Sequence, residues 1–366
     1  MLRAGRRSNP APRSLLPSST KPSYCSLKGR WVLSFVIRRV LVSLPLLLLA
    51  SIVAFILVVN TGDPIEDLRT KPNVPKATIA LREHELGLDK PVVERYVAWL
   101  GKAVHGDFGK TIKNRPVWGE VSRAIGVTLR LVLFAEIVSV LLGVLIGVIS
   151  AVKQYSWFDH GATTGAFLLY SLPVLAVGSF LKYVLAIRFN RWIGRADDPL
   201  IKTIGEGTAN FCTASKPYNC GFIPSVTDFL SHAFLPMLTL VLISFAGYAR
   251  FSRAAMLETL NADYVRTARA KGLSERRVIM KHAFRNALTT IATIVSLDFG
   301  ALIGGAILTE TIFEWHGMGR VLVESINKID PNLLLCWFFV TAVAVIVFNL
   351  VADFAYAFLD PRIRLD

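Results

Sequence analysis

Residues 263–273 read Asp263-Tyr264-Val265-Arg266-Thr267-Ala268-Arg269-Ala270-Lys271-Gly272-Leu273. This basic stretch lies between two long apolar segments, and its spacing is typical of a short amphipathic helix. Tyr264, Val265 and Ala268 fall on one face at helical spacing, whereas Arg266 and Arg269 fall on another. A membrane protein that places such a helix outside the bilayer offers a docking surface there.

The residues after this stretch predict how the helix ends and how the next one begins. Gly272 is suited to the left-handed position just past a helix C-terminus, because it has no Cβ to be strained at positive φ. Ser274 is a residue type that caps helix N-termini, and Glu275 would follow in the first turn. The sequence therefore predicts two short helices separated by a glycine stop.

Composition indicates that most of the chain is surrounded by lipid. Hydrophobic residues make up 53% of the 366 residues and charged residues only 18%, which leaves too little polar material for a soluble protein of this length. A helix that crosses a bilayer needs about 20 mostly apolar residues. Six segments meet this condition, so we predict an all-α integral membrane protein with spans at residues 33–59, 123–152, 161–188, 231–250, 287–312 and 333–358.

Basic residues predict the orientation. Nine Lys and Arg residues and no acid precede residue 40, and the loop 253–286 carries eight Lys and Arg against Glu258, Asp263 and Glu275. By the positive-inside rule both segments are cytoplasmic, as are both termini. The net charge of +15 gathers in these two segments, which orientation and anionic lipid explain better than nucleic-acid binding.

The chain divides by composition into an extension and a membrane domain. Residues 1–30 are rich in Pro, Ser and Arg, which is typical of a disordered basic extension, and residues 31–366 form the transmembrane domain. Within it we expect an external module at 60–120 and an external loop at 189–230. Cys212 and Cys220 lie in that loop, where an oxidising compartment would favour a disulfide between them. Two unrelated thiols are the alternative.

Ionisable residues inside the spans are costly and so carry information. Glu136 in the second span and Asp298 in the fifth lie nearest the middle of the membrane, whereas Lys182 and Asp353 lie near span ends, where they can reach the interface. Glu136 and Asp298 could face a substrate cavity and receive an ammonium group. They could equally be satisfied by neighbouring helices.

Small residues and prolines predict packing and bends. The pairs Gly143 with Gly147, Gly161 with Gly165, and Gly300 with Gly304 have the four-residue spacing that lets helix backbones approach closely. Pro45 and Pro173 each remove a backbone donor within a span, so both spans should be kinked.

Motifs of common enzymes are incomplete. Gly109-Lys110-Thr111 resembles the end of a phosphate-binding loop, but position 104, where the motif needs its first glycine, is Val104. His84-Glu85 begins like a zinc protease helix, yet the second histidine would fall at Leu88. We therefore expect no enzyme activity, no metal site and no ATP hydrolysis by this chain.

Four segments together resemble a known family. The stretch 264–272, followed by His282, Arg285 and Leu288, resembles the EAA loop of binding-protein-dependent ABC importer permeases, in the dipeptide and oligopeptide form that has Thr267-Ala268-Arg269 in place of Glu-Ala-Ala. The resemblance extends to Leu235-Pro236-Met237-Leu238-Thr239-Leu240, to Glu310-Thr311-Ile312-Phe313-Glu314-Trp315-His316-Gly317-Met318-Gly319 and to Asp360-Pro361-Arg362-Ile363-Arg364. It covers the chain from about residue 31 onward and leans toward the oligopeptide permease B branch.

The resemblance implies a fold, partners and a mechanism. The fold would be that of a type I, MetI-like importer with six transmembrane helices, located in the bacterial plasma membrane. A homologous second permease, two ABC ATPase subunits or a fused ATPase, and an extracytoplasmic peptide-binding protein would complete the complex, and the ATPases would bind ATP and Mg. Residues 263–272 would dock on an ATPase, and the substrate path would lie between the two permeases.

A secondary transporter driven by ions or protons is the competing class. It would use Glu136 and Asp298 as coupling groups. That class predicts internal inverted repeats, which are not evident in the sequence.

Overall fold

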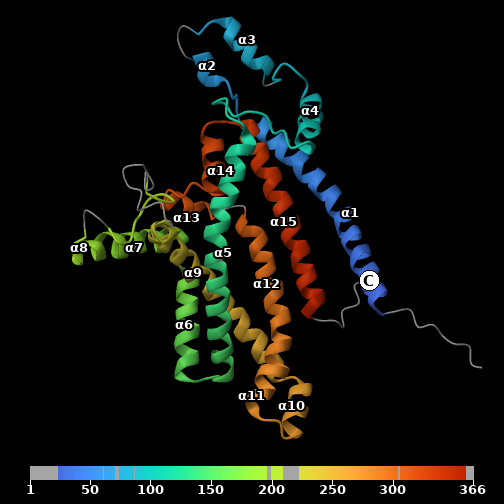
Figure 1. The fold of residues 1–366 in the computed structure, drawn as a ribbon, viewed down its shortest axis with the longest axis vertical. Coiled ribbons are helices and arrows are strands. Elements are labelled where there is room, and N and C mark those ends of the chain that lie inside the picture. Colours follow the sequence, from blue (N-terminus) through green and yellow to red (C-terminus); the bar gives the residue numbers. More distant parts are fainter. Residues whose placement is uncertain are drawn as a thin grey trace, which may run out of the picture. The chain divides into compact units, whose positions relative to one another are not determined.

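The computed structural model describes residues 24–60, 62–70, 74–85, 87–195, 199–208, 222–303 and 306–359. In these ranges the chain is helical, and its β structure is one isolated antiparallel bridge between Lys110 and Pro116 (Figure 1). Cys212, Cys220 and Gly304 lie outside the described residues, as does the side chain of Asp353.

Contacts divide the chain into two units, residues 1–42 and residues 43–366. The first unit contains the first part of helix α1 (Tyr24–Val59), which begins inside the segment expected to be an extension. The second unit contains the remainder of α1 and all later helices.

Four helices are long and apolar enough to cross a membrane, by length and composition. They are Ile37–Val59 in α1, α5 (Val117–Val152), Ser225–Leu260 in α9 (Phe222–Leu260) and Pro331–Val351 in α15 (Pro331–Leu359). Each overlaps a span predicted from the sequence. The spans expected at 161–188 and 287–312 differ from the structure.

The third predicted span is broken where a kink was expected. Helix α6 (Trp157–Ser171) ends before Pro173, and the next segment leaves at an angle of 101°. That segment comprises α7 (Val174–Leu181), the π-helix η1 (Lys182–Phe189) and α8 (Asn190–Trp192). Pro173 stands before the first residue of α7 and has no N–H to extend α6, so the break follows from its chemistry. The bend predicted at Pro173 is therefore confirmed, and it is a break between two helices and not a kink within one.

The fifth predicted span is also shorter than expected. It corresponds to α12 (Arg285–Ile303), and α13 (Ile307–Ile312) is a separate helix. At 1.5 Å per residue, the 19 residues of α12 reach about 28 Å, close to the thickness of a bilayer core. Between α9 and α12 lie α10 (Asp263–Ala270), α11 (Glu275–Arg277) and the π-helix η3 (Val278–Phe284).

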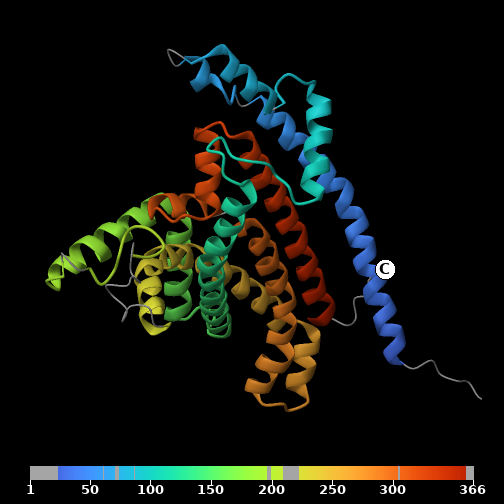
Figure 2. The same ribbon diagram turned by 45° about the horizontal axis from the view of Figure 1, so that its top comes forward.

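Helices α5 and α9 form the most extensive helix–helix contact among the described residues of the second unit (Figures 1 and 2). A Cβ on Gly143 would lie 2.5 Å from the Cβ of Tyr248, and one on Gly147 would lie 2.5 Å from the carbonyl oxygen of Ala249. The prediction that these glycines permit close backbone approach is therefore confirmed. For Gly161 and Gly165 it is wrong within the described part of this chain, because a Cβ there would meet nothing within 4 Å.

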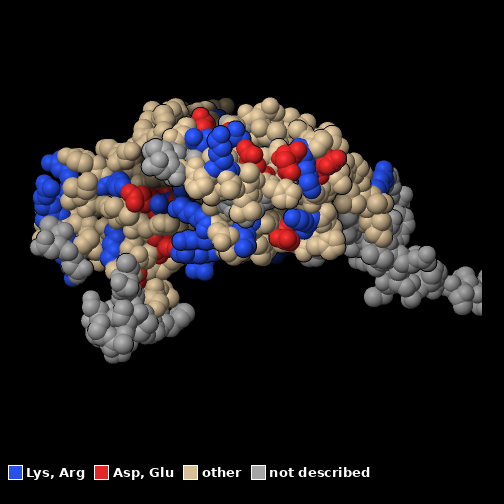
Figure 3. Space-filling view, turned by 90° about the horizontal axis from the view of Figure 1, so that it is seen from above, with Lys and Arg blue, Asp and Glu red and all other residues tan. Residues whose placement is uncertain are grey.

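Three short helices, α2 (Glu66–Thr70), α3 (Lys76–Glu85) and α4 (Val92–Val104), form the segment expected to be an external module. Helix α4 is anchored by aromatic contacts, with Tyr96 against Phe55 at 5.4 Å and Trp99 against Phe339 at 6.0 Å between ring centroids. Lys and Arg side chains are interspersed with Asp and Glu on the face seen in Figure 3. Arg69 and Glu83, for example, form an ion pair at 2.5 Å on this segment.

A buried carboxylate organises the turn between α13 and α14 (Met318–Asn327). Glu310 is fully buried, and its Oε2 accepts hydrogen bonds from the backbone N–H of Gly319 at 2.8 Å and of Arg320 at 3.3 Å. Its Oε1 accepts from the hydroxyl of Thr128 at 2.6 Å, which ties the turn to α5. A negative side chain at these free N–H groups is favourable because the helix N-terminus carries partial positive charge. Glycine is needed at 317 and 319 because a Cβ at either would collide with this carboxylate or its surroundings.

This arrangement predicts that Glu310→Gln destabilises the protein. The amide has one acceptor oxygen where the carboxylate uses two, so a buried donor from Thr128 or from the α14 N-terminus would lose its partner, at about 1–3 kcal/mol. Thermal unfolding of the purified protein in detergent, followed by tryptophan fluorescence, should show a lower midpoint. Glu314→Gln is the matched control, since Glu314 is exposed in the same turn. Equal midpoints for the two variants would contradict the capping role.

Candidate functional site

Helix α10 is held against the rest of the protein by one narrow face. Val265 is completely buried and Ala268 is 6% exposed. They pack in a cluster, here called the loop platform, whose other members are Ala151, Ala255, Met256, Val278, Ala283 and Ala287. Tyr264 was expected on the same face but is 43% exposed, because its position is one residue, or about 100°, away from Val265 around the helix.

Gly272 adopts the predicted left-handed conformation, with φ of +75°. Its N–H donates to the carbonyl of Arg269 at 2.9 Å, and the N–H of Leu273 donates to the carbonyl of Ala268 at 3.4 Å. These bonds satisfy carbonyls that the end of α10 would leave free. The predicted glycine stop is therefore confirmed.

The start of α11 differs from the expected side-chain cap. Ser274 occupies the N-cap position, but its side chain accepts no capping hydrogen bond. Glu275 instead accepts a hydrogen bond from Nη2 of Arg269 at 2.8 Å and a longer one from its Nε. That guanidinium holds the pKa of the Glu275 carboxyl below its usual value. The bond joins α10 to α11 across the Gly272 turn.

The remaining surface of the loop is open. Of the ten residues 263–272, all except Val265 and Ala268 are exposed. They include Arg266 and Lys271, and the neighbouring Arg276, Arg277 and Lys281 are exposed as well. The loop thus combines a fixed apolar face with a basic outer face.

An ion pair between a buried carboxylate and a partly buried arginine fixes the helices that carry the loop platform. Asp159, near the start of α6, accepts from Nε of Arg253 at 2.6 Å and from its Nη2 at 2.8 Å. It also accepts from the hydroxyl of Ser150 on α5 and from the N–H of Tyr155. Bidentate pairing of this kind is strong and directional. It clamps the ends of α5, α6 and α9 together directly beside the loop platform.

The two carboxylates singled out in the spans meet at one tyrosine. The hydroxyl of Tyr248 on α9 lies within hydrogen-bonding distance of Oε1 of Glu136 on α5 and 2.9 Å from Oδ2 of Asp298 on α12. Glu136 and Tyr248 are 1% and 3% exposed, whereas Asp298 is exposed. The cluster therefore joins three helices and reaches a surface of this chain through Asp298.

Lys182, the cation predicted to lie near a span end, is engaged within the protein. Its Nζ donates to the carbonyl of Ile312 at 3.0 Å, which connects η1 to the end of α13. Among the described residues, no group of three or more His, Cys, Asp or Glu side chains is placed to hold a metal.

Comparison with known proteins assigns the family. Residues 143–365 match the model of the binding-protein-dependent transport system inner membrane component, and residues 32–131 match the N-terminal model of the same component. The oligopeptide transport system permease protein OppB of Mycobacterium tuberculosis is 38% identical over 90% of this chain and 99% of its own length.

The chain belongs to the binding-protein-dependent transport permease family. Two further relatives each match 91% of the chain and 99% of their own length. They are the dipeptide transport system permease protein DppB of Escherichia coli, 35% identical, and the di/tripeptide transport system permease protein DppB of Pseudomonas aeruginosa, 37% identical. The family resemblance found in the sequence is thereby confirmed. Members of this family are inner membrane components of transport systems.

Sequence reasoning missed three residues of these sites in the permease. Tyr248 carries a weak signal, a hydroxyl within an apolar span, opposite a glycine of the partner helix. Asp159 and Arg253 are charged residues near the ends of apolar stretches, where composition suggests solvent or lipid headgroups. Their pairing depends on the tertiary contact between α6 and α9 and has no local sequence signal.

The carboxylate cluster predicts that Tyr248→Phe lowers stability. The buried Glu136 carboxyl would lose its hydrogen-bond donor while its position stays buried, at about 1–3 kcal/mol. Tyr170→Phe removes the same hydroxyl from an exposed tyrosine of α6 and should change little. Thermal unfolding midpoints of the two variants in the same detergent check this. Indistinguishable midpoints would show that the Tyr248 hydroxyl stabilises nothing.

Proposed function

We propose that this chain is a transmembrane permease subunit of an ATP-driven ABC importer of peptides and that it forms half of the translocation pathway. The observation that carries the proposal is helix α10, whose apolar face is fixed in the loop platform while its basic face is exposed. Family membership supports the transport role, and the names of the relatives support peptides as substrates.

Coupling to ATP hydrolysis would pass through residues 263–272, the predicted EAA coupling helix. The ATPase would bind the exposed face of α10, and its movement on ATP binding would displace that helix. Val265 and Ala268 would carry the displacement into the loop platform and so to α5 and α9. The Asp159–Arg253 pair would make these helix ends move together, as a rigid-body transition requires.

The topology that we propose has six spans. Five correspond to α1, α5, the bent pair that starts with α6, α9 and α15, and α12 would be the sixth. The basic loop 253–286 and both termini would lie in the cytoplasm, by the positive-inside rule. The module 60–120 and the loop 189–230 would then face outside, in a bacterial plasma membrane protein.

The complex would contain further subunits. A homologous second permease would complete the path, two ABC ATPase subunits or one fused ATPase would bind ATP and Mg, and an extracytoplasmic binding protein would deliver peptide. The permease chain itself would need no cofactor, and it would contact lipid and no nucleic acid.

Substitution of Gly272 tests the coupling role. Valine is strained at positive φ by about 1–2 kcal/mol, whereas asparagine tolerates it. A Cβ at this position meets nothing within 4 Å, so both variants differ from glycine mainly in backbone preference. In proteoliposomes that contain the whole complex, Gly272→Val should hydrolyse ATP with several-fold less peptide uptake per ATP, and Gly272→Asn should resemble wild type.

Two controls complete the coupling experiment. Co-purification of the ATPase with each variant shows whether the complex still assembles. Normal uptake per ATP in an assembled Gly272→Val complex would refute the proposed role of the glycine-stopped helix.

The carboxylate cluster suggests where a peptide ammonium group would bind. Asp298 lies 13 residues from the start of α12, about 20 Å along its axis, and its exposed side chain would face the cavity shared with the second permease. Asp298→Asn should preserve assembly but lower uptake of free-amine peptides more than that of N-acetylated peptides. Radiolabelled uptake of matched peptide pairs measures the difference. An equal loss of uptake for both peptides would show that Asp298 contributes to helix packing and not to recognition of the amino group.

An ion- or proton-coupled transporter remains the second candidate because two carboxylates share one hydroxyl inside the helix bundle. That mechanism requires uptake driven by an ion or proton gradient without ATP. Proteoliposomes given a gradient but no nucleotide distinguish the two functions.

A further inference from the structure

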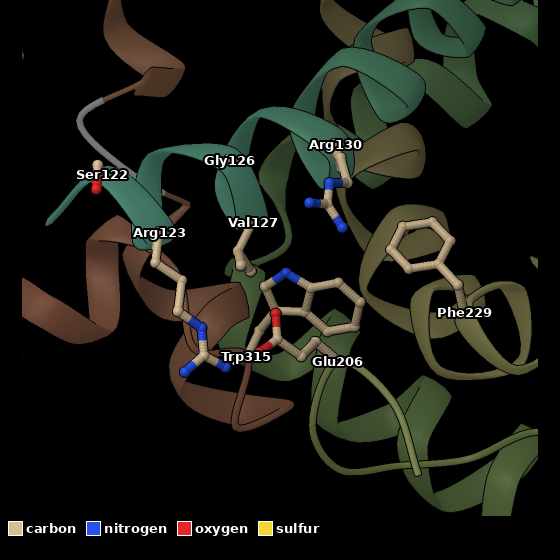
Figure 4. Close-up of a pocket in the computed structure, with 8 residues that line it drawn as sticks. All are labelled: Ser122, Arg123, Gly126, Val127, Arg130, Glu206, Phe229 and Trp315. Carbon is tan, nitrogen blue, oxygen red and sulfur yellow. Dashed lines mark hydrogen bonds and ion pairs between the residues drawn. The ribbon is translucent and has the colours of Figure 1, made fainter. Parts of the chain in front are cut away.

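A cavity of about 400 Å³ lies near the start of α5, away from the carboxylate cluster and the coupling loop. Its walls come from α5, from the segment after α8, from α9 and from the turn before α14 (Figure 4). The lining residues are Ser122, Arg123, Gly126, Val127, Arg130, Glu206, Phe229 and Trp315. Its volume falls in the range of small-molecule sites.

The cavity has one more positive charge than negative charge. Nη2 of Arg123 pairs with Oε1 of Glu206 at 2.7 Å. Arg130 lies two helical turns further along α5, on the same face, and has no acidic partner within 4 Å in the described part of the chain. In Figure 4 its guanidinium points toward the Trp315 ring. A ligand with a negative charge would balance it.

The position of Arg130 makes that charge significant. It lies seven residues, about 10 Å along the axis, inside the segment 123–152 that the sequence predicts to cross the membrane. Arginine at such depth is unfavourable unless it faces water or an anion. An exposed arginine on a cavity wall meets this condition.

Aromatic rings form the opposite wall and offer the guanidinium no negatively charged partner. Trp315 is fully buried, and its ring packs against Phe229 at 6.0 Å and an angle of 66°. The indole Nε1 is a buried donor with no hydrogen-bond acceptor in the described part of the chain. Donors thus exceed acceptors around the cavity, and the aromatic rings supply an apolar surface beside the charge.

We propose that this cavity binds the carboxylate of the transported peptide, with Arg130 as its bidentate partner. The inference deepens the proposed peptide import, on which it rests, by assigning the recognition of the carboxyl end of the substrate. Planar guanidinium and carboxylate groups form two parallel hydrogen bonds, and Phe229 would pack against the adjacent side chain. A small cavity between helices suits the end of a peptide better than a protruding surface of a binding protein, which needs a broader contact.

Peptides that differ only at the carboxyl end test the proposal. Uptake into proteoliposomes that contain the complete complex, binding protein and ATP is measured for a free-acid peptide and its C-terminal amide. Each rate for Arg130→Gln is divided by the wild-type rate for the same peptide, so that the preference of the binding protein cancels. We expect about a tenfold loss for the free acid, equivalent to about 1.4 kcal/mol, and less than twofold for the amide.

Matched variants separate loss of recognition from loss of structure. Arg191→Gln removes an exposed positive charge outside the cavity and should leave the uptake rates of both peptides unchanged. Gly126→Leu fills the cavity, because the space beside a Cβ at this position is open to 4 Å, and should lower uptake of the free acid. Arg130→Lys keeps the charge and should retain part of the preference for the free acid.

The outcomes distinguish failure of the proposed carboxylate site from failure of the proposed ATP-driven peptide import. Failure of the wild-type complex to import either peptide with ATP would reject the proposed function itself. Import by wild type with an unchanged acid-to-amide ratio in Arg130→Gln would overturn only the carboxylate site. An equal loss for both peptides would also overturn it, and would assign Arg130 to assembly or to docking of the binding protein.

Discussion

The close contact between α5 and α9 is the constraint on which the rest of the structure depends. Gly143 and Gly147 bring no side chain to that interface, so the backbone of α9 lies directly on α5. Position 143 meets residues 245–249 and position 147 meets residues 249–253, so the two helices run in the same direction. This register places Tyr248 beside Glu136 and Arg253 within reach of Asp159. The Tyr248–Glu136 contact and the Arg253–Asp159 pair therefore both depend on glycine at positions 143 and 147.

Helix α9 connects the features that a transport cycle would need to link. Arg253 is five residues, about 8 Å, beyond Tyr248, and Met256 of the loop platform is eight residues, about 12 Å, beyond it. The helix is continuous over this length, and polar contacts hold it at two positions along its axis, Tyr248 and Arg253. A displacement of α10 that moved the end of α9 would thus be felt at the carboxylate cluster. This follows from rigidity and contact, and it requires no catalytic group in the permease.

The sequence predicted those features that depend on residue spacing, backbone preference and segment length alone. The boundaries of α10 and the left-handed Gly272 follow from residue spacing and backbone preference, and the four long apolar helices follow from the length that a bilayer demands. Features that depend on partners far away in the sequence were missed. Asp159 and Arg253 are 94 residues apart, and nothing in the sequence indicated that they pair. Tyr264 lies outside the buried face because only a two-residue stripe of α10 meets the loop platform. Pro173 was recognised as a perturbation, but whether a proline bends or breaks a span depends on the surrounding packing, which the sequence does not display.

Residues 310–319 have a structural role that also shapes the cavity next to Arg130. The Glu310 carboxylate accepts hydrogen bonds from N–H groups at the start of α14. The backbone carbonyl of Glu310 accepts a hydrogen bond from the N–H of Trp315 at 2.8 Å. One residue thereby fixes both the helix and the indole that lines the cavity next to Arg130. That cavity lies where α5 and α9 begin, and the loop platform lies where they end. Since Gly143 and Gly147 join the same two helices between these sites, a peptide carboxylate bound at one end and an ATPase bound at the other would act on a single rigid pair.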